Sequence, residues 1–574
     1  MTHPPLRIGG GSAFFIDSAM AVPQLLGAGV DVIILDYLAE GAMGLLGRMK
    51  LADPASGYPS DFLDVHIGPF LPQIAAQGVK IISNAGGVNP AALAQALRGK
   101  VAELGLSLKI SYIDGDDLIA RLPDFADTHD MFTGAAFPQQ GVTSANAYLG
   151  GFPIAEALAC GADIVITGRV VDSALALGPL IHHFGWRPGD FTQLAGGTLA
   201  GHLIECGPQV TGGTFTDWRD VDGWANIGAP IAECYADGSC LITKPDGTGG
   251  LVSVGTVAEQ MLYEVGDPQA YFVPDVTCDF STVTLEQVGD HRVLVKNATG
   301  YPPTATLKAC ATWDDGWRAV VYQPIIGKDA PAKAAKQSEA LFERGRMMLR
   351  GRNLADWRRT ECVTIGAKGN PDCEEVVAKL VVEHDEALAV QMFAREQFAA
   401  ISAMAPGTSV SFGVQIQPCM SLISFLVPKS DVRASVDGEV FKMPDVVGFD
   451  PAIVVRPPQP VAAPVAGDQI LEDLAYARSG EKGETINIGV IARQPEHLPA
   501  LRAALTEDAI REWLPDLGDF RVTIYDLPGT HALNLVLDGA LPGGLNASQR
   551  LDPAAKSIAQ RMMRFPVGAA AEPS

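Results

Sequence analysis

Residues 79–90 read Val-Lys-Ile-Ile-Ser-Asn-Ala-Gly-Gly-Val-Asn-Pro, and this stretch decides the fold. A short apolar strand, Val79–Ser83, runs into a turn made of asparagine and glycine. Pro90 fits the first position of the following helix, which we expect over Ala91–Leu104. A strand, a polar glycine turn and a helix in this order indicate half of a βαβ unit.

The same alternation repeats on both sides of this stretch. We predict further strands at Arg7–Gly11, Val32–Leu35, Ser107–Ile113 and Asp163–Thr167, and helices near Met20–Gly27, Ile154–Cys160 and Ser173–Leu180. Such spacing is typical of an α/β domain with a parallel sheet, in which ligands bind beyond the carboxyl ends of the strands. We therefore expect the active-site crevice at Gly9–Ser12, Asp36–Glu40, Asn84–Asn89 and Thr167–Asp172.

The pattern changes after about residue 195. Glycine clusters alternate with short β-branched runs such as Leu251–Val257 and Val293–Lys296, with helices near Ala334–Leu349 and Asp385–Ala400. A proline-rich segment at 457–464 is typical of a stiff linker. In the segment after the linker we predict strands near Ile486–Arg493 and Phe520–Leu527 and helices near Leu498–Leu514 and Asp552–Met563. We divide the chain into an α/β region (1–195), a β-rich α+β continuation (196–455), a linker (456–467), a small α+β domain (468–567) and a tail (568–574).

Composition limits the function. The 574 residues include 66 acidic and 42 basic ones, a formal charge of −24 that repels nucleic acid and anionic membranes. Nine dispersed cysteines without a CxxC pair predict reduced thiols and argue against structural zinc. The sequence has no apolar run of about 18 residues, and Met1–Arg7 does not resemble a secretory signal. We expect a soluble, cytoplasmic protein in which an anionic substrate needs a local basic pocket.

Residues 478–489 read Arg-Ser-Gly-Glu-Lys-Gly-Glu-Thr-Ile-Asn-Ile-Gly. So polar a stretch makes a poor core, because buried polar atoms without partners cost free energy. It predicts a loop that brings backbone N–H groups and the Lys482 ammonium to an anionic ligand. Ser479 and Lys482 also have the spacing of an S-x-x-K nucleophile pair, but the glycines argue against the helix that this pair needs. We favour Lys482 as an electrostatic clamp.

Arg169 follows a predicted strand end, where its guanidinium can bind a carboxylate or phosphate. Asp172 can orient Arg169 or cap the next helix, and the pair can equally pin a loop. His202 and Glu205 share a helix face and suit proton transfer, although a single histidine on an apolar helix is also a common core residue. They could form half of a metal site, but nothing in the sequence completes one.

Two glycine-rich turns are weaker candidates. The Gly-Gly-Gly-Ser turn at 9–12 lacks the full G-x-G-x-x-G spacing of a dinucleotide site, so an ordinary tight turn is the alternative. The Asp-Gly-Thr-Gly-Gly turn at 246–250 can cradle an anion or can be a hairpin loop, and we favour the loop.

Together these motifs resemble the acyclic terpene utilisation family called AtuA, and the resemblance covers nearly the whole chain. In the N-terminal part it rests on Arg7–Gly11, Leu38–Glu40, Ser83–Pro90, Ile166–Arg169, His202–Gly207 and Gln209–Gly213. In the C-terminal part it rests on Arg478–Gly483, Asn487–Gly489, Leu527–Gly529, Ala532–Asn534 and Arg550–Pro553, which are similar to the family's ferredoxin-fold domain.

The resemblance implies catabolism of branched or terpenoid carboxylic acids at the acyl-CoA level. Our leading hypothesis is a cofactor-independent hydratase or lyase whose substrate can be a CoA thioester, with no metal. We expect Arg169 and Lys482 to bind the anionic group or thioester oxygen, and His202 and Glu205 to move the proton. The expected substrate-binding residues are Gly10, Gly11, Asn84, Gly86, Gly87, Asn89, Thr167, Asp172, Gly249, Ser479, Gly480, Gly483 and Asn487.

Two alternatives remain open. The protein can be a non-catalytic or assembly partner of an acyl-CoA carboxylase or related complex, with the small C-terminal domain docking onto it. It can also be a metal-dependent enzyme. In either case we expect a homo-oligomer that binds neither nucleic acid nor membrane.

Overall fold

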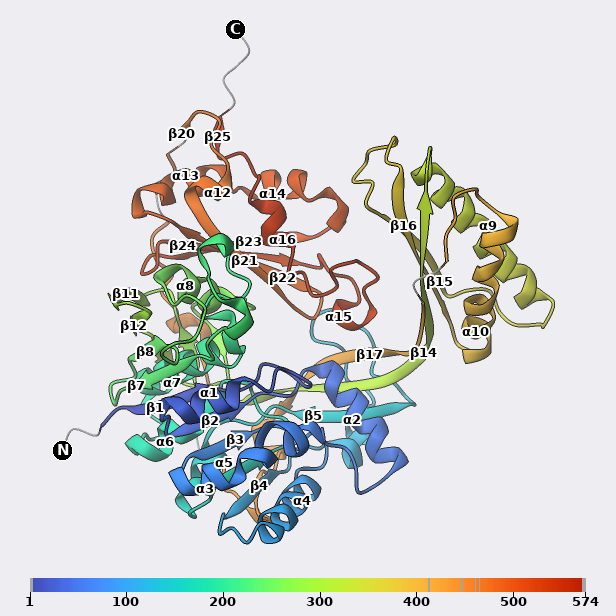
Figure 1. Ribbon diagram of the computed structural model, residues 1–574. Coiled ribbons are helices and arrows are strands. Elements are labelled where there is room, and N and C mark those ends of the chain that lie inside the picture. The colour runs from blue at the N-terminus through green and yellow to red at the C-terminus, as the bar shows by residue number, and fades with distance from the viewer. Residues whose placement is uncertain (1–3, 411–412, 445–447, 460, 464, 570–574) are drawn as a thin grey trace. The chain divides into compact units, whose positions relative to one another are not determined.

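A computed structural model describes residues 4–410, 413–444, 448–459, 461–463 and 465–569 (Figure 1). Three sequence predictions fall partly outside these residues. They concern the N-terminus at residues 1–3, the linker at Pro460 and Pro464, and the tail at residues 570–574. No helix within the described ranges is long and apolar enough to cross a membrane.

The chain forms two compact units. The larger contains the described residues within 1–312, 422–545 and 554–574, and the smaller contains those within 313–421 and 546–553. Strands β14 (Thr306–Ile326) and β17 (Val414–Pro428) have residues in both units. The boundaries expected near residues 195, 455 and 467 stay predictions.

An 11-stranded sheet is the framework of the larger unit (Figure 1). Its centre is parallel, in the order β1 (Leu6–Gly10), β2 (Val32–Leu35), β3 (Lys80–Ser83), β6 (Ile164–Thr167) and β4 (Ile110–Asp114). All four residues of β2 and of β6 are buried, because a sheet covered on both faces needs continuous apolar strands. The predicted α/β fold with a parallel N-terminal sheet is confirmed.

Antiparallel strands extend this sheet at both edges. On one side they are β7 (Ile231–Cys234), β8 (Cys240–Thr243), β12 (Arg292–Lys296) and β11 (Thr284–Gly289), and on the other β18 (Ser435–Val436) and β19 (Glu439–Val440). A second sheet of three short strands has the order β13 (Thr299–Tyr301), β10 (Thr277–Asp279) and β9 (Tyr271–Phe272). The region after residue 195 is thus rich in strands, as predicted.

Helices connect the strands of the larger unit. They are α1 (Ala21–Ala28), α2 (Glu40–Ala52), α3 (Leu71–Gln77), α4 (Pro90–Glu103), α5 (Phe152–Ala159), α6 (Ala174–Phe184), α7 (Phe191–Ile204) and α8 (Val254–Leu262). Pro90 lies at the first position of α4, as expected. The β-branched run at Leu251–Val257 leads into helix α8 and forms no strand, because Ser253 caps α8 through a reciprocal hydrogen-bond pair with Thr256.

The C-terminal segment of the larger unit has its own four-stranded antiparallel sheet. Its order is β21 (Ala475–Lys482), β22 (Thr485–Ala492), β24 (Ala532–Asp538) and β23 (Arg521–Leu527). Ile486, Ile488 and Val490 alternate along β22 into a buried core. The loop predicted over 478–489 is therefore wrong, since these residues are two paired strands joined at Gly483 and Glu484.

The helices of this segment are shorter than predicted. The expected helix at Leu498–Leu514 is broken into α13 (Leu498–Ala504) and α14 (Glu507–Trp513), because Thr506 caps the second one through Ala509 N. The expected helix at Asp552–Met563 is reduced to α16 (Ile558–Met562). Ala555 has a left-handed backbone, with φ of 54°, that a continuous helix cannot contain.

In the smaller unit, helices pack on an antiparallel sheet. The sheet pairs β15 (Arg359–Ile365), β16 (Glu375–His384), β14 and β17, and the helices are α9 (Ala330–Arg350) and α10 (Ala387–Glu396). Val321, Leu380 and Phe393 are buried together in its core. The two helices predicted in this region are present.

Candidate functional site

The carboxyl ends of the parallel strands carry a buried polar network. Asp36 follows β2 and Asn84 follows β3, and the Asn84 side-chain amide donates to Oδ1 of Asp36 at 2.6 Å. The Ser12 hydroxyl, just beyond β1, donates to the backbone oxygen of Asp36 at 2.9 Å. Burial raises the pKa of Asp36 well above its usual value, and the charge on Asp172 adds to the shift while that on Arg169 opposes it. Asp36 thus holds its proton more tightly than an ordinary aspartate does.

Arg169 lies beside this network, two residues after β6. Its side chain is only 4% exposed, and its Nη1 donates to Leu38 O at 2.5 Å and to Oδ1 of Asp172 at 2.9 Å. The guanidinium also stacks on the ring of Tyr148, with 4.3 Å from Cζ to the ring centroid. These contacts fix the guanidinium in one place. They also pair Arg169 with Asp172, and both are site residues predicted from the sequence.

Glu40, at the start of α2, connects further cations to Arg169. The Tyr148 hydroxyl donates to its Oε1 at 2.5 Å, and the Lys308 ammonium lies 3.4 Å from the same oxygen. Burial alone would raise the pKa of Glu40, but the charges on Lys308, Arg169 and Lys482 bring it well below the usual range. Glu40 therefore stays ionised at neutral pH.

A cavity of about 10 Å³ borders Arg169. Its lining residues are Glu40, Met43, Ser144, Asn146, Tyr148, Arg169, Cys310 and Thr312. Two buried atoms on these residues, Arg169 Nε and Asn146 Oδ1, form no hydrogen bond within the described part of the chain. One water molecule fits this volume and can bridge a donor and an acceptor of this kind. A metabolite is far too large for this cavity, so a ligand of the charged residues would contact them from their solvent-exposed side.

Lys482 lies on the solvent-exposed side of these charged residues. It ends β21, its side chain is 51% exposed, and its Nζ lies 3.0 Å from Oε2 of Glu264, two residues beyond α8. Glu264 raises the pKa of Lys482 well above the usual value against the opposing effect of burial, and Asp172 and Glu40 add to the shift. Arg169 interacts electrostatically with the same two carboxylates. We call Glu40, Arg169, Asp172, Glu264, Lys308 and Lys482 the charged cluster.

His202 and Glu205 lie next to the charged cluster. His202 is on the last turn of α7, and its Nδ1 is 3.3 Å from Oε1 of Glu205. Burial raises the pKa of Glu205, with Asp172 adding to the shift and His202 and Lys482 opposing it. His202 Nε2 is buried without a hydrogen-bond partner among the described residues. The two side chains can exchange a proton, as their spacing along the chain predicts.

Most of the other predicted binding residues contact protein groups. Asn89 donates to the backbone oxygens of Pro54 and Ser56, at 3.0 and 2.7 Å. The Thr167 hydroxyl donates to Gly168 O at 2.8 Å. Ser479 donates to Ala555 O at 2.6 Å and accepts from Ala559 N at 2.9 Å, so its hydroxyl holds the start of α16. These contacts give the three side chains a structural role.

The predicted glycines permit close packing. A Cβ atom on Gly10 would lie 2.2 Å from Ile204 O, at the end of α7, and one on Gly480 would lie 2.6 Å from the ring of Tyr263. Gly480 and Asn487 therefore dock the C-terminal hairpin against the end of α8 (Figure 1). The remaining predicted glycines occupy tight backbone contacts or left-handed turns: Gly11, Gly86, Gly87, Gly249 and Gly483.

Several residues of the charged cluster were not singled out as site residues from the sequence. Glu40 falls within a predicted strand-end segment, whereas Lys308 and Glu264 belong to no recognised motif, and neither does Tyr148, which contacts Glu40. Tyr148 and Lys308 reach Glu40 across 108 and 268 residues of sequence. Only the fold brings such distant residues together, so no local signal could have identified them.

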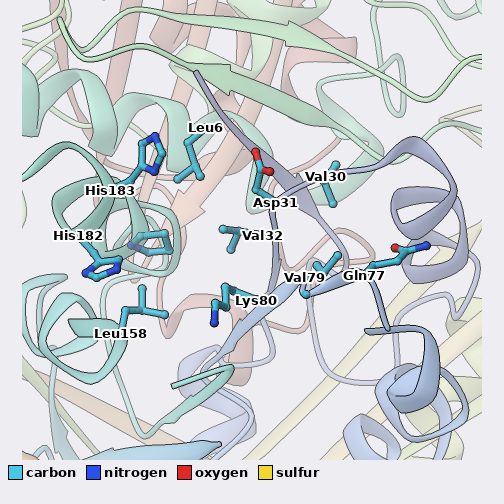
Figure 2. A pocket seen from close by; sticks show the side chains of 12 residues that line it. Leu6, Val30, Asp31, Val32, Gln77, Val79, Lys80, Leu158, His182 and His183 are labelled. Atoms are coloured by element: carbon cyan, nitrogen blue, oxygen red, sulfur yellow. The ribbon is translucent and has the colours of Figure 1, made fainter. Parts of the chain in front are cut away.

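A larger cavity, of about 320 Å³, lies at the amino ends of the parallel strands, away from the charged cluster at their carboxyl ends (Figure 2). Leu6, Val32 and Lys80, the first residues of β1, β2 and β3, contribute to its wall. Its charged groups already have protein partners, since Lys80 pairs with Asp163 at 2.7 Å and Asp31 accepts from Arg7 N at 2.9 Å. We therefore place the candidate site at the charged cluster.

Two segments of the chain match known family models. The chain matches the acyclic terpene utilisation family protein AtuA over residues 6–437 and the AtuA ferredoxin-like domain over residues 469–568. A search of curated proteins finds no match. The first matched segment contains Arg169 and Glu40, and the second contains Lys482, so each family segment contributes to the charged cluster. The chain belongs to the acyclic terpene utilisation family AtuA and carries its ferredoxin-like C-terminal domain.

Proposed function

We propose that this protein is an enzyme of acyclic terpene catabolism that acts on a branched carboxylic acid or its CoA thioester as a hydratase or lyase. The observation that carries the proposal is the charged cluster. Three of its six members, Arg169, Lys308 and Lys482, are cations, in a chain with a formal charge of −24. The other three members, Glu40, Asp172 and Glu264, are carboxylates, so the cluster is locally neutral and repels an anionic substrate less than the rest of this acidic chain does.

The carboxyl groups around the charged cluster add little negative charge to it. Burial raises the pKa of Asp36 and of Glu205, and it raises that of Glu481, next to Lys482, to about 8. Carboxyl groups with raised pKa values carry less negative charge at pH 7 and do not cancel the neighbouring cations. They are also able to donate protons, which hydration and elimination both need.

The proposed chemistry uses the exposed face of the charged cluster. The Lys482 ammonium stabilises the negative charge that develops on the carboxylate or thioester oxygen, with Arg169 adding to the field from behind. Glu205 and His202 exchange the proton at the neighbouring carbon. In hydration, a water oxygen bonds to one alkene carbon and a proton to the other, and elimination reverses both steps. This reaction needs no cofactor.

Incubation in D₂O with a panel of branched 2-enoyl-CoA and 3-hydroxyacyl-CoA thioesters tests the proposal. We expect mass spectrometry to show addition of D₂O to one of the enoyl thioesters, or the reverse loss of water from its hydroxyacyl partner. Lys482→Met should reduce the rate at least about 100-fold, the loss of one oxyanion-stabilising group. Lys296→Met, which breaks an exposed pair with Glu286 at 3.2 Å, should leave the rate unchanged.

Two results would count against the proposal. One is turnover by Lys482→Met or Arg169→Ala at the wild-type rate. The other is absence of turnover over the whole panel together with a stable complex with an acyl-CoA carboxylase on gel filtration. The second result would favour an assembly role.

A further inference from the structure

Two cysteines face each other across the hairpin of β7 and β8. Cys234 is the last residue of β7, Cys240 is the first residue of β8, and the antiparallel register places them directly opposite each other. Side chains of directly opposite residues lie on the same face of a sheet. Both cysteines are free and buried. Their spacing in the sequence matches no recognised thiol motif, so only the fold reveals the pair.

The turn between the two strands fixes this register. Gly238 N donates to Tyr235 O at 3.0 Å, and Tyr235 N donates to Ser239 O at 2.9 Å. Gly238 has a left-handed backbone, with φ of 90°, and the Asp237 carboxylate accepts from Ser239 N at 3.0 Å. These features are typical of a three-residue hairpin loop that ends in a glycine bulge, and such a loop permits one pairing of its strands.

The turn also shows which kind of pair the cysteines form. Hydrogen-bonded and non-hydrogen-bonded pairs alternate along an antiparallel ladder, and the next pair, Tyr235 and Ser239, is joined by a backbone hydrogen bond. Cys234 and Cys240 are therefore a non-hydrogen-bonded pair, a class in which the Cα atoms are about 4.5 Å apart. A disulfide spans Cα separations of about 4.4 to 6.8 Å, so this pairing permits a bond between the two sulfur atoms.

The two thiols interact electrostatically and are protected in the resting protein. Burial raises the pKa of Cys234 well above its usual value, and a charge on Cys240 adds to the shift. Burial also raises the pKa of Cys240. Because the thiolate is the reactive form, the pair stays reduced until an oxidant reaches it, and it then reacts slowly.

A small oxidant can come close to this pair. Leu6 of β1 lies directly opposite Cys234 on the other side of β7, so their side chains are neighbours on one face of the sheet. Leu6 also lines the cavity of about 320 Å³ at the amino ends of the parallel strands (Figure 2). A hydroperoxide is far smaller than this cavity, and there a single side chain would separate it from Cys234.

We propose that Cys234 and Cys240 form a redox-active dithiol, which a hydroperoxide converts to a disulfide across the β7–β8 hairpin. One thiolate attacks a peroxide oxygen and the O–O bond breaks, which leaves a sulfenic acid. The departing hydroxide or alkoxide takes up the proton that this thiol lost. The second thiol then attacks the sulfenic sulfur, and its proton leaves with the sulfenic oxygen as water. The sulfur atoms are oxidised and the peroxide is reduced. This dithiol is independent of the charged cluster and of the proposed function.

Peptide mapping of the wild-type protein treated with hydrogen peroxide tests the proposal. Cleavage after glutamate releases residues 234–259, which contain both cysteines and no other. The protein is treated until the reaction stops, and is then unfolded and alkylated. We expect this peptide to have lost two hydrogen atoms and to carry no alkyl group. Dithiothreitol should restore both thiols, since it reduces a disulfide and does not reduce a sulfinic acid.

Cys278 is the internal control. It is also buried in a sheet, on β10, but its register partners are a glycine and a tyrosine, so it should form no disulfide. The variant Cys240→Ser should likewise leave Cys234 without a disulfide. Three results would overturn the inference: two free thiols in the wild-type peptide when the reaction has stopped, sulfinic acids on both of its sulfur atoms, or a disulfide from either cysteine to a third one.

Discussion

Arg169→Met is expected to lower the free energy of unfolding by about 3 kcal/mol and to abolish turnover, because it removes one partner of a buried ion pair. The methionine leaves Leu38 O without its donor and Asp172 without its 2.9 Å counter-charge. Glu40 also loses one of the three cations that keep it ionised. Urea unfolding measures the stability, and the D₂O assay measures the turnover.

Arg98→Met is the matched control. Arg98 also donates to a backbone oxygen, Ile110 O at 2.7 Å, pairs with a carboxylate, Asp437 at 3.2 Å, and lies 5.9 Å from the ring centroid of Tyr112. Its side chain is 46% exposed, so its removal should cost less than about 1 kcal/mol. Equal losses of stability in the two variants would mean that Arg169 is not in a buried ionic network.

Asn487→Leu is expected to destabilise the protein by about 3 to 5 kcal/mol, since each buried polar group left without a partner costs about 1 to 3 kcal/mol. Asn487 donates to Leu262 O at 2.7 Å and to Oδ1 of Asn534 at 3.0 Å, and it accepts from Glu264 N at 2.8 Å. Leucine has a similar volume and satisfies none of these groups. Urea unfolding at constant protein concentration measures the loss.

The same substitution should also affect the charged cluster. Without Asn487, the left-handed backbone of Glu264 loses its hydrogen bond, so Glu264 is held less firmly beside Lys482 and turnover in the D₂O assay should fall as well. Thr485→Ala on the same strand removes only a partly buried hydrogen bond to Asp538, of 3.2 Å, and should cost less than about 1.5 kcal/mol. A loss of stability no larger than that of Thr485→Ala would contradict the docking role of Asn487.

The sequence predicts the parallel sheet well because its signals are local. Strands β2, β3 and β6 are short, largely apolar runs that Asp36, Asn84 and Arg169 follow within one or two residues, and a sheet covered on both faces favours apolar side chains. The pairs Arg169–Asp172 and His202–Glu205 are also predictable, because residues three apart can meet within one turn of chain.

The C-terminal hairpin shows why the rest could not be predicted. Its glycines and polar residues are typical of a loop, but Gly480 and Gly489 make room for Tyr263 and Leu262 at the end of α8. Arg478, Ser479 and Asn487 are buried because partners far away in the sequence satisfy or stack on them. Tertiary contacts of this kind override local preference, and a single sequence does not contain them.

The titration of Lys482 tests most directly whether the ferredoxin-like domain places this lysine among the carboxylates of the N-terminal segment. Reductive methylation with ¹³C-formaldehyde gives each lysine a ¹H–¹³C signal whose shift follows its protonation, and Lys→Arg variants assign the signals. We expect Lys482 to keep its proton to a higher pH than a free lysine does, and Asp172→Asn to lower the pKa of Lys482. A Lys482 signal that titrates with the surface lysines and does not respond to Asp172→Asn would contradict a shared charged cluster.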